Sequence, residues 1–373
     1  MQLHRNNALA HIARLALYSA VFFVLFQILL VVCLPLSTVY YYRMDYDVVK
    51  DNIADVGATL DMVKREIRQK HLEDYVILLG DSIMYSGPGG PTQSIGYFLN
   101  RGCEWVFNLA IPAAQMGDFY TLLLMLDERG ISTDHVVLNL TYAGFVKRDP
   151  DPPIVYWLGR ELARLDLETY RSIAPDLARS REKQWSSDPF DSYLEYEVYP
   201  RIPVLKYKDF IRAAVERKLG LRPIQEGDPR PWREKAYLKE LLKQPVYRKT
   251  FDPSPLQLDD ANPNVAFLKR IAEHQKGKDL LLFMSPINPE LMQDEINEPG
   301  FVRNEVRLNS FLEDMACHYG FQYIDLSGVI SPDQFADHVH LTGEGYKSLA
   351  RIIRKEILSA WGVAPWVSTH HSS

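Results

Sequence analysis

The segment Tyr75-Val76-Ile77-Leu78-Leu79-Gly80-Asp81-Ser82 is the most informative stretch of this chain. Its first five residues form an apolar run without polar alternation, a pattern typical of a parallel strand buried on both faces. Ser82 follows directly, where such a strand turns into a helix. Ligands of open parallel sheets gather beyond the carboxyl ends of the strands. We therefore expect Ser82 to lie at a functional site.

Further apolar and helix-like segments continue this pattern along the chain. Strands are predicted at Trp105–Leu109, His135–Leu140, Leu280–Ser285 and Phe321–Asp325, and helices at Met116–Glu128, Pro263–Lys276, Val302–His318 and Glu344–Ser359. Short apolar strands that alternate with amphipathic helices indicate an α/β fold, in which a parallel sheet is covered on both faces.

The alternation stops between residues 146 and 263. This region contains Asp149-Pro-Asp-Pro-Pro153, and helical fragments are expected at Trp157–Leu167 and Lys208–Leu219. It holds 22 of the 42 Lys and Arg residues and 20 of the 48 acids, so it is near neutral while the remainder is acidic. We interpret it as a helical insertion, either a lid or a docking subdomain. Its surface is either a face for an anionic polymer or lipid headgroups, or a solvated face of mixed charge.

A long uncharged segment, Leu15–Tyr42, lies near the N-terminus. About 20 apolar residues cross a bilayer as a helix, so we expect an uncleaved membrane anchor. A cleaved signal peptide, a lipoprotein attached at Cys33 and a buried core helix are the alternatives. Arg5 and Arg14 precede the segment, and this bias favours a cytoplasmic N-terminus and a periplasmic or otherwise extracytoplasmic body. Tyr40–Tyr42 would form an aromatic belt at the outer interface.

The predicted organisation has seven parts. They are a cytoplasmic tail (1–14), a single-pass anchor in the cell membrane (15–42), a juxtamembrane helix or stalk (43–72), the first half of the α/β domain (73–145), the insertion (146–263), the second half of the domain (264–362) and a tail (363–373). The helix of the stalk is expected at Val48–Lys70.

Composition excludes several other classes. A formal net charge of -6 and the lack of a strongly basic domain argue against a nucleic-acid binder. Cys103 and Cys317 either pair or remain free thiols. No CxxC-type metal spacing occurs, and no Gly-Lys-Ser/Thr follows the glycines at 87–90. We expect neither a metal nor a cofactor.

A second informative segment, Asp337-His338-Val339-His340, lies near the other end of the domain. A serine nucleophile needs an imidazole to take its proton and a carboxylate to orient that imidazole. We therefore expect Ser82 as nucleophile, His340 as general base and Asp337 as its orienting group. The alternatives are helix caps at Asp81-Ser82 and Asp337, or a metal site that includes His338. We assign His338 to structure.

Together these segments resemble the SGNH or GDSL-type hydrolase superfamily. Its first block, Gly-Asp-Ser after the first strand, is matched by Gly80-Asp81-Ser82. Its last block, Asp-x-x-His before Leu and a Gly-containing helix start, is matched by Asp337, His340, Leu341 and Gly345. The resemblance covers residues 75–358, interrupted by the insertion. It implies a flavodoxin-like three-layer fold and a serine hydrolase or acyltransferase.

Two internal blocks depart from the family pattern. The family's Asn-x-x-x-x-Gly, whose glycine N–H lines the oxyanion hole, runs here from Asn108 to Ala113. The family's Gly-x-Asn-Asp, whose Asn also donates, is replaced by Asn139-Leu-Thr-Tyr-Ala-Gly-Phe145. The resemblance assigns the oxyanion to the N–H groups of Ser82 and Ala113, with Thr141 or Tyr142 as a replacement donor. Loss of one donor would cost about 3 kcal/mol in the rate.

These departures, the anchor and Ser285-Pro-Ile-Asn288 are similar to the DltD-like branch of membrane-tethered acyltransferases. The resemblance implies transfer of an O-acetyl or D-alanyl group to an extracytoplasmic glycopolymer, with a membrane-bound O-acyltransferase as partner. Asp81 and Asn288 are candidate substrate contacts, and a turn cap before Pro289 is the alternative for Asn288. An SGNH-type esterase or deacetylase, and a catalytically degenerate scaffold that binds a membrane acyltransferase, remain alternatives.

Overall fold

A computed structural model describes residues 2–33, 54–85, 88–100, 106–146, 157–180, 190, 193–221 and 227–361. The chain forms two compact units. The N-terminal unit comprises Met1–Met62 and Ser186–Pro223, and the sheet unit comprises Val63–Trp185 and Ile224–Ser373. The predicted α/β domain falls in the sheet unit, and the apolar N-terminal segment falls in the N-terminal unit.

A five-stranded parallel sheet forms the centre of the sheet unit. Its strands are β1 (Val76–Leu79), β2 (Val106–Asn108), β3 (His135–Leu140), β4 (Asp279–Met284) and β5 (Gln322–Asp325). They stand in the order β2-β1-β3-β4-β5, and all neighbouring strands are parallel. This is the flavodoxin-like order, in which the switch point lies between β1 and β3. The predicted fold class is confirmed.

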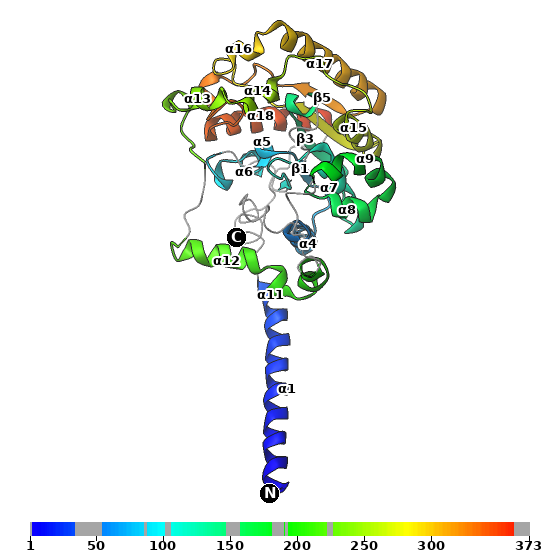
Figure 1. Ribbon diagram of the computed structural model, residues 1–373, viewed down its shortest axis with the longest axis vertical. Helices are drawn as coiled ribbons and strands as arrows, with labels where there is room; N and C mark the ends of the chain where they lie inside the picture. The colour runs from blue at the N-terminus through cyan, green and yellow to red at the C-terminus, as the bar shows by residue number, and fades with distance from the viewer. Residues whose placement is uncertain are drawn as a thin grey trace, which may run out of the picture. The chain divides into compact units, whose positions relative to one another are not determined.

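Helices cover both faces of this sheet (Figure 1). On one face α6 (Ile95–Asn100) packs against α18 (Gly343–Ala360), and on the other α7 (Met116–Glu128) packs against α15 (Pro263–His274). The chain runs outward from β1 to β2 and then returns to β3, so right-handed crossovers place α6 and α7 on opposite faces. The apolar side chains of β1, β3 and β4 are buried between these layers.

Local capping explains where the long helix α17 (Pro299–Tyr319) begins and ends. The Glu298 carboxylate accepts the N–H groups of Gly300 and Phe301, so the helix starts earlier than the predicted Val302. It ends at Gly320, whose φ of 82° is the left-handed conformation of a helix C-terminus. The short helix α16 (Gln293–Ile296) precedes it.

The region between β3 and β4 is helical, as expected. Its elements are α8 (Gly159–Leu165), α9 (Leu167–Ser180), η4 (Leu194–Val198), η5 (Tyr199–Arg201), α11 (Pro203–Lys206), α12 (Lys208–Lys218), η6 (Trp232–Glu234), α13 (Leu238–Leu242), α14 (Pro245–Arg248) and η7 (Lys249–Phe251). Residues 186–223 group with the N-terminal helices, whereas the flanking parts group with the sheet. Asp149–Pro153 lies outside the described residues.

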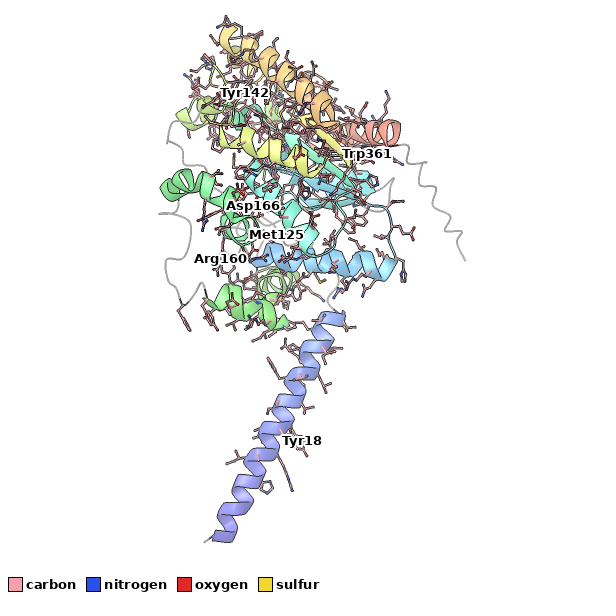
Figure 2. The ribbon with its side chains drawn as sticks, turned by 90° about the vertical axis from the view of Figure 1, so that its right-hand side faces the viewer. Tyr18, Met125, Tyr142, Arg160, Asp166 and Trp361 are labelled. Carbon is pink, nitrogen blue, oxygen red and sulfur yellow. The ribbon has the colours of Figure 1, made fainter. Side chains whose placement is uncertain are left out.

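The N-terminal unit contains a long apolar helix, α1 (Gln2–Cys33). Its segment His11–Cys33 has a mean hydropathy of 2.6 and is long and apolar enough to span a membrane. Tyr18 on this helix is 67% exposed and projects outward (Figure 2). Gln27 Oε1 accepts the N–H of Val204 at 2.8 Å, which joins α1 to α11. The transmembrane topology stays a prediction.

A second helix, α4 (Ala54–Lys70), corresponds to the predicted stalk helix, and its residues up to Met62 belong to this unit. Its side chains Ala58 and Met62 form a small apolar core with Tyr207 and Phe210. The aromatic belt at Tyr40–Tyr42 lies outside the described residues. So does Cys103, and its pairing with Cys317 therefore stays a prediction.

Candidate active site

Ser82 lies where β1 ends and is the first residue of the short helix α5 (Ser82–Tyr85). Asp81 Oδ1 accepts the N–H of Ile83 at 2.9 Å, so Asp81 caps this turn and leaves the Ser82 hydroxyl available. A Cβ atom at Gly80 would overlap Asn139 Oδ1 and Met84 Cβ, which explains the glycine there. The cap of this turn is thus Asp81 and not Ser82.

The Ser82 hydroxyl meets a loop that we call the Asp-His loop, residues Ala336–His340. His340 Nε2 lies 3.0 Å from Ser82 Oγ, and His340 Nδ1 lies 2.8 Å from Asp337 Oδ2. Asp337 Oδ1 accepts the N–H groups of Val339 at 2.9 Å and His340 at 2.7 Å, which fixes the carboxylate. The His340 side chain is 25% exposed and that of Asp337 21%. The three side chains form one continuous hydrogen-bonded row.

His340 and Asp337 shift each other's pKa. Burial lowers the pKa of His340, but the carboxylates of Asp337 and Asp81 together raise it, and the net shift is upward. Burial raises the pKa of Asp337, whereas His340 and its N–H lower it by more, so this carboxylate stays ionised. With Nδ1–H donating to Asp337, Nε2 is left to accept a proton from Ser82.

The backbone N–H groups of Ser82 and Ala113 are the expected donors of an oxyanion hole. Neither the N–H of Ser82 nor that of Ala113 has an acceptor within the described part of the chain. Ala113 has a φ of 59°, in the left-handed region that glycine tolerates best. The alanine therefore keeps the conformation that a glycine would adopt at this turn. Its backbone donor survives the substitution, at some cost in strain.

Tyr142 has a different role from the oxyanion donor that we expected. It lies in η2 (Tyr142–Gly144), and its hydroxyl donates to the Asp252 carbonyl at 2.9 Å and accepts from Asn304 Nδ2 at 2.9 Å. Its ring packs on Phe301 in α17, and Tyr142 is labelled in Figure 2. The phenol proton is thus used, and Tyr142 joins η7 to α17. Thr141 precedes η2 and is partly exposed; its role stays a prediction.

Asn139 is a site residue to which the sequence analysis gave no role. It is buried on β3, its Nδ2 donates to Asp81 Oδ1 at 2.9 Å and to Ser285 Oγ at 3.0 Å, and its Oδ1 accepts the Asp81 N–H at 3.0 Å. It therefore ties the carboxyl ends of β1, β3 and β4 together behind Ser82. A polar amide inside an otherwise apolar strand was the signal that could have identified it.

Asn288 does not contact solvent, so it is not placed as a substrate contact. Its side chain is fully buried, and its Oδ1 accepts the N–H groups of Glu290 and Leu291, both at 3.1 Å. This is the turn cap given as the alternative role. Its Nδ2 also donates to the Asp337 carbonyl at 3.3 Å, and its N–H donates to the His338 carbonyl at 2.9 Å. Asn288 thus supports the Asp-His loop through the backbone carbonyls of Asp337 and His338.

Asp81, the other candidate substrate contact, is occupied by the protein itself. One carboxylate oxygen is bonded to Ile83 and Asn139, and burial raises the pKa of this group. Its contacts are those of a residue that shapes the turn before Ser82.

The first end of the insertion is built into the oxyanion turn. Trp157 Nε1 donates to the Pro112 carbonyl at 3.2 Å. The buried Asp118 accepts the N–H of Leu158 at 2.8 Å and that of Gln115 at 3.0 Å. These bonds attach the turn that contains Ala113 to the insertion. The interpretation of the insertion as a lid or a docking subdomain stays a prediction.

His338 lies beside Asp337, with its Nδ1 3.5 Å from Asp337 Oδ1. Tyr247 and Phe251 of the insertion pack edge-on against its ring, with centroids 5.6 and 6.0 Å away. Burial lowers the pKa of His338, which favours the neutral imidazole. Among the described residues, no group of three or more His, Cys, Asp or Glu side chains is arranged to hold a metal ion.

Comparison with known proteins adds one structural similarity. No protein-family model matches the chain, and no curated protein does. Among solved structures, the chain is similar to a carbohydrate acetylesterase family member from Sinorhizobium meliloti, with 10% identity and a TM-score of 0.33. The match covers 78% of this chain and 100% of that one.

Proposed function

We propose that this protein is a serine acyl-transfer enzyme that works through an acyl-Ser82 intermediate. The observation that carries the proposal is the row from Ser82 Oγ through His340 to Asp337, with distances of 3.0 and 2.8 Å. A nucleophile, a base and an orienting carboxylate in hydrogen-bond reach are the arrangement this chemistry needs.

In the proposed first step, Ser82 Oγ attacks an acyl carbonyl while His340 Nε2 takes the hydroxyl proton. The N–H groups of Ser82 and Ala113 stabilise the oxyanion, and His340 returns the proton to the leaving group. In the second step, His340 removes a proton from an acceptor hydroxyl, which attacks the acyl-serine and frees Ser82. The acceptor is a sugar hydroxyl in a transferase, or water in an esterase or deacetylase.

The acceptor we propose is an extracytoplasmic glycopolymer, and the acyl group is of the O-acetyl or D-alanyl type. Helix α1 supports this because its apolar segment suits a membrane anchor. A tether raises the effective concentration of the enzyme near a donor that emerges at the membrane. The proposed partner that delivers the donor is a membrane-bound O-acyltransferase.

A fluorophosphonate probe tests the nucleophile directly. The full-length chain should label at Ser82, and Ser82→Ala should abolish labelling. Ser132→Ala is the matched control, since Ser132 precedes β3 at the opposite end of the sheet and bonds only to Asp134 through its hydroxyl. A folded wild-type protein that never labels would favour the scaffold that binds a membrane acyltransferase.

Transfer and hydrolysis need a separate measurement. An aryl acetate ester would be supplied with and without a glycan acceptor, and both acetylated glycan and free acetate would be quantified. Transfer predicts that the glycan captures most of the acetyl groups and that Ser82→Ala gives neither product. Release of acetate alone, at a rate that the glycan does not change, would point to the esterase.

A further inference from the structure

Lys235 is a buried cation that the proposed mechanism leaves without a role. It follows η6 and is only 4% exposed. Its Nζ donates to the Ala336 carbonyl at 2.8 Å and to the Asp228 carbonyl. No carboxylate among the described residues forms an ion pair with it. A buried ammonium held by carbonyl oxygens alone is costly, so its place in the fold calls for a reason.

The carbonyl that Lys235 binds belongs to Ala336, the first residue of the Asp-His loop. The Ala336 N–H donates to the His340 carbonyl at 2.8 Å, which closes this loop into a tight turn. Trp232, in the same segment, donates its N–H to the Phe335 carbonyl and its Nε1 to the Pro332 carbonyl, both at 3.0 Å. Trp232 and Lys235, in the later part of the insertion, are thus hydrogen-bonded to the segment that directly precedes Asp337 and His340.

The charge of Lys235 also acts on the His340 imidazole. The groups that face His340 electrostatically are Asp337 and Asp81, which favour the imidazolium, and Lys235, which opposes it. His338 lies on the other side of Asp337 and is affected by the same carboxylate. Burial lowers the pKa of Lys235, while Asp228 and Asp337 raise it and Arg230 lowers it. Lys235 is the one cation of this group that donates a hydrogen bond into the loop.

We propose that Lys235 is a positioning residue, which holds the Asp-His loop in register with Ser82 and limits the protonation of His340. This inference rests on the proposed function. Asp337 draws protons to the imidazole, and a nearby ammonium counteracts that attraction. The insertion thereby supplies a group that keeps more of the base in its neutral, reactive form near pH 7.

The test is the pH dependence of fluorophosphonate labelling in full-length variants. Lys235→Met removes both the hydrogen bonds and the charge, Lys235→Gln keeps a donor without the charge, and Lys235→Arg keeps the charge. Lys278→Met is the matched control, because Lys278 is a partly buried lysine that bonds to Thr133 at the opposite end of the sheet.

We expect Lys235→Met and Lys235→Gln to raise the labelling midpoint by about half a pH unit or more, since loss of a nearby like charge stabilises the imidazolium. Lys235→Met should also slow labelling at high pH by about tenfold through loss of alignment. Lys235→Arg should stay near the wild-type midpoint, and Lys278→Met should match the wild type throughout.

Unchanged midpoints and rates in Lys235→Gln and Lys235→Met would overturn the inference. If Lys235→Met does not fold, Lys235→Gln decides, and an unchanged midpoint there has the same meaning. A loss of thermal stability with no change in the midpoint would reduce Lys235 to a structural residue, which also contradicts the proposal. Failure of the proposed function differs from all of these, because the wild type itself would then not label.

Discussion

At the scale of single residues, chemistry depends on the protonation of His340. Its pKa is raised above the ordinary 6.5 because the combined influence of Asp337 and Asp81 outweighs burial. Only the neutral imidazole accepts the serine proton, so activity should be lost as the pH falls through this raised pKa. The ionised Asp337 maintains the shift, since its own pKa is held well below the ordinary value.

The first prediction follows from the upward shift of the His340 pKa. The rate of phosphonate labelling should rise with pH through a single midpoint above 6.5. Asp337→Asn should move the midpoint downward, because the attraction for the proton is removed, and should lower the plateau rate by about 10⁴-fold through loss of the correct tautomer. Stopped labelling time courses between pH 5 and pH 9 measure both. A midpoint that rises in Asp337→Asn would contradict the arrangement.

The second residue prediction concerns Ala113, whose φ of 59° strains an L-residue. The left-handed conformation costs an alanine about 1–2 kcal/mol, and a glycine would avoid this cost. Glycine loses more conformational entropy on folding, which offsets about 0.5–1 kcal/mol of that gain. Ala113→Gly should therefore gain up to about 1 kcal/mol of stability. Thermal unfolding in detergent measures it. Ala114→Gly is the control: this neighbour is buried without a positive φ, so its change should destabilise.

At the scale of elements, the site depends on how strand ends are joined. β1, β3 and β4 each bring one polar residue to the same place, and Asn139 bonds to both Asp81 and Ser285. A parallel sheet has all its carboxyl ends on one edge, which is why residues from distant parts of the sequence meet there. The loops fastened to this edge then hold Ser82 against the Asp-His loop.

The third prediction tests this junction. Asn139→Ala removes three hydrogen bonds and leaves the N–H of Asp81 without its acceptor, so we expect a loss of about 2–4 kcal/mol in stability. Labelling of Ser82 should slow as the turn after β1 loosens. Asn297→Ala, which changes an exposed asparagine after α16, should cost less than about 0.5 kcal/mol. Equal thermal midpoints for the two variants would show that Asn139 does not stabilise the junction of the strand ends.

At the scale of the whole molecule, the chain combines a sheet unit that holds the site with a unit built around α1. The insertion has residues in both, because residues 186–223 group with α1 and the first part of α4, while Trp157 and Lys235 on either side of them are hydrogen-bonded to the loops of the site. Within the insertion the chain therefore passes from the sheet unit to the N-terminal unit after Trp185 and returns after Pro223.

The fourth prediction concerns the proposed anchor. The full-length chain should stay in the membrane pellet after extraction at alkaline pH. Replacing Leu25 and Leu29 together by Arg should release it, because each charge near the middle of a membrane helix costs about 2.5–3.5 kcal/mol. Leu167→Arg is the control, since this exposed leucine lies on α9 in the sheet unit. Release of the wild type by the same treatment would exclude an integral anchor.

Much of the fold could be predicted because its signals are local. Apolar runs located each strand to within about a residue at either end, as expected where periodicity and buried length agree. The helix Met116–Glu128 begins and ends where predicted, since Gln115 and Asp118 form a capping arrangement that is contiguous in sequence. Local signals failed at α17, where the Glu298 cap lies before the apolar pattern begins.

By itself, the sequence determined the class of fold, the order of its elements and the residue types available for chemistry at Ser82, Asp337 and His340. These follow from short-range patterns of hydrophobicity and spacing. Only the tertiary structure decided which groups use their hydrogen bonds elsewhere. Tyr142 and Asn288 turned out to support the scaffold, and Asn139 and Lys235 turned out to hold the site together. The reason is physical: each of these roles depends on partners far away in the chain, and no local pattern encodes which distant carbonyl or carboxylate will lie within 3 Å or so of a given donor.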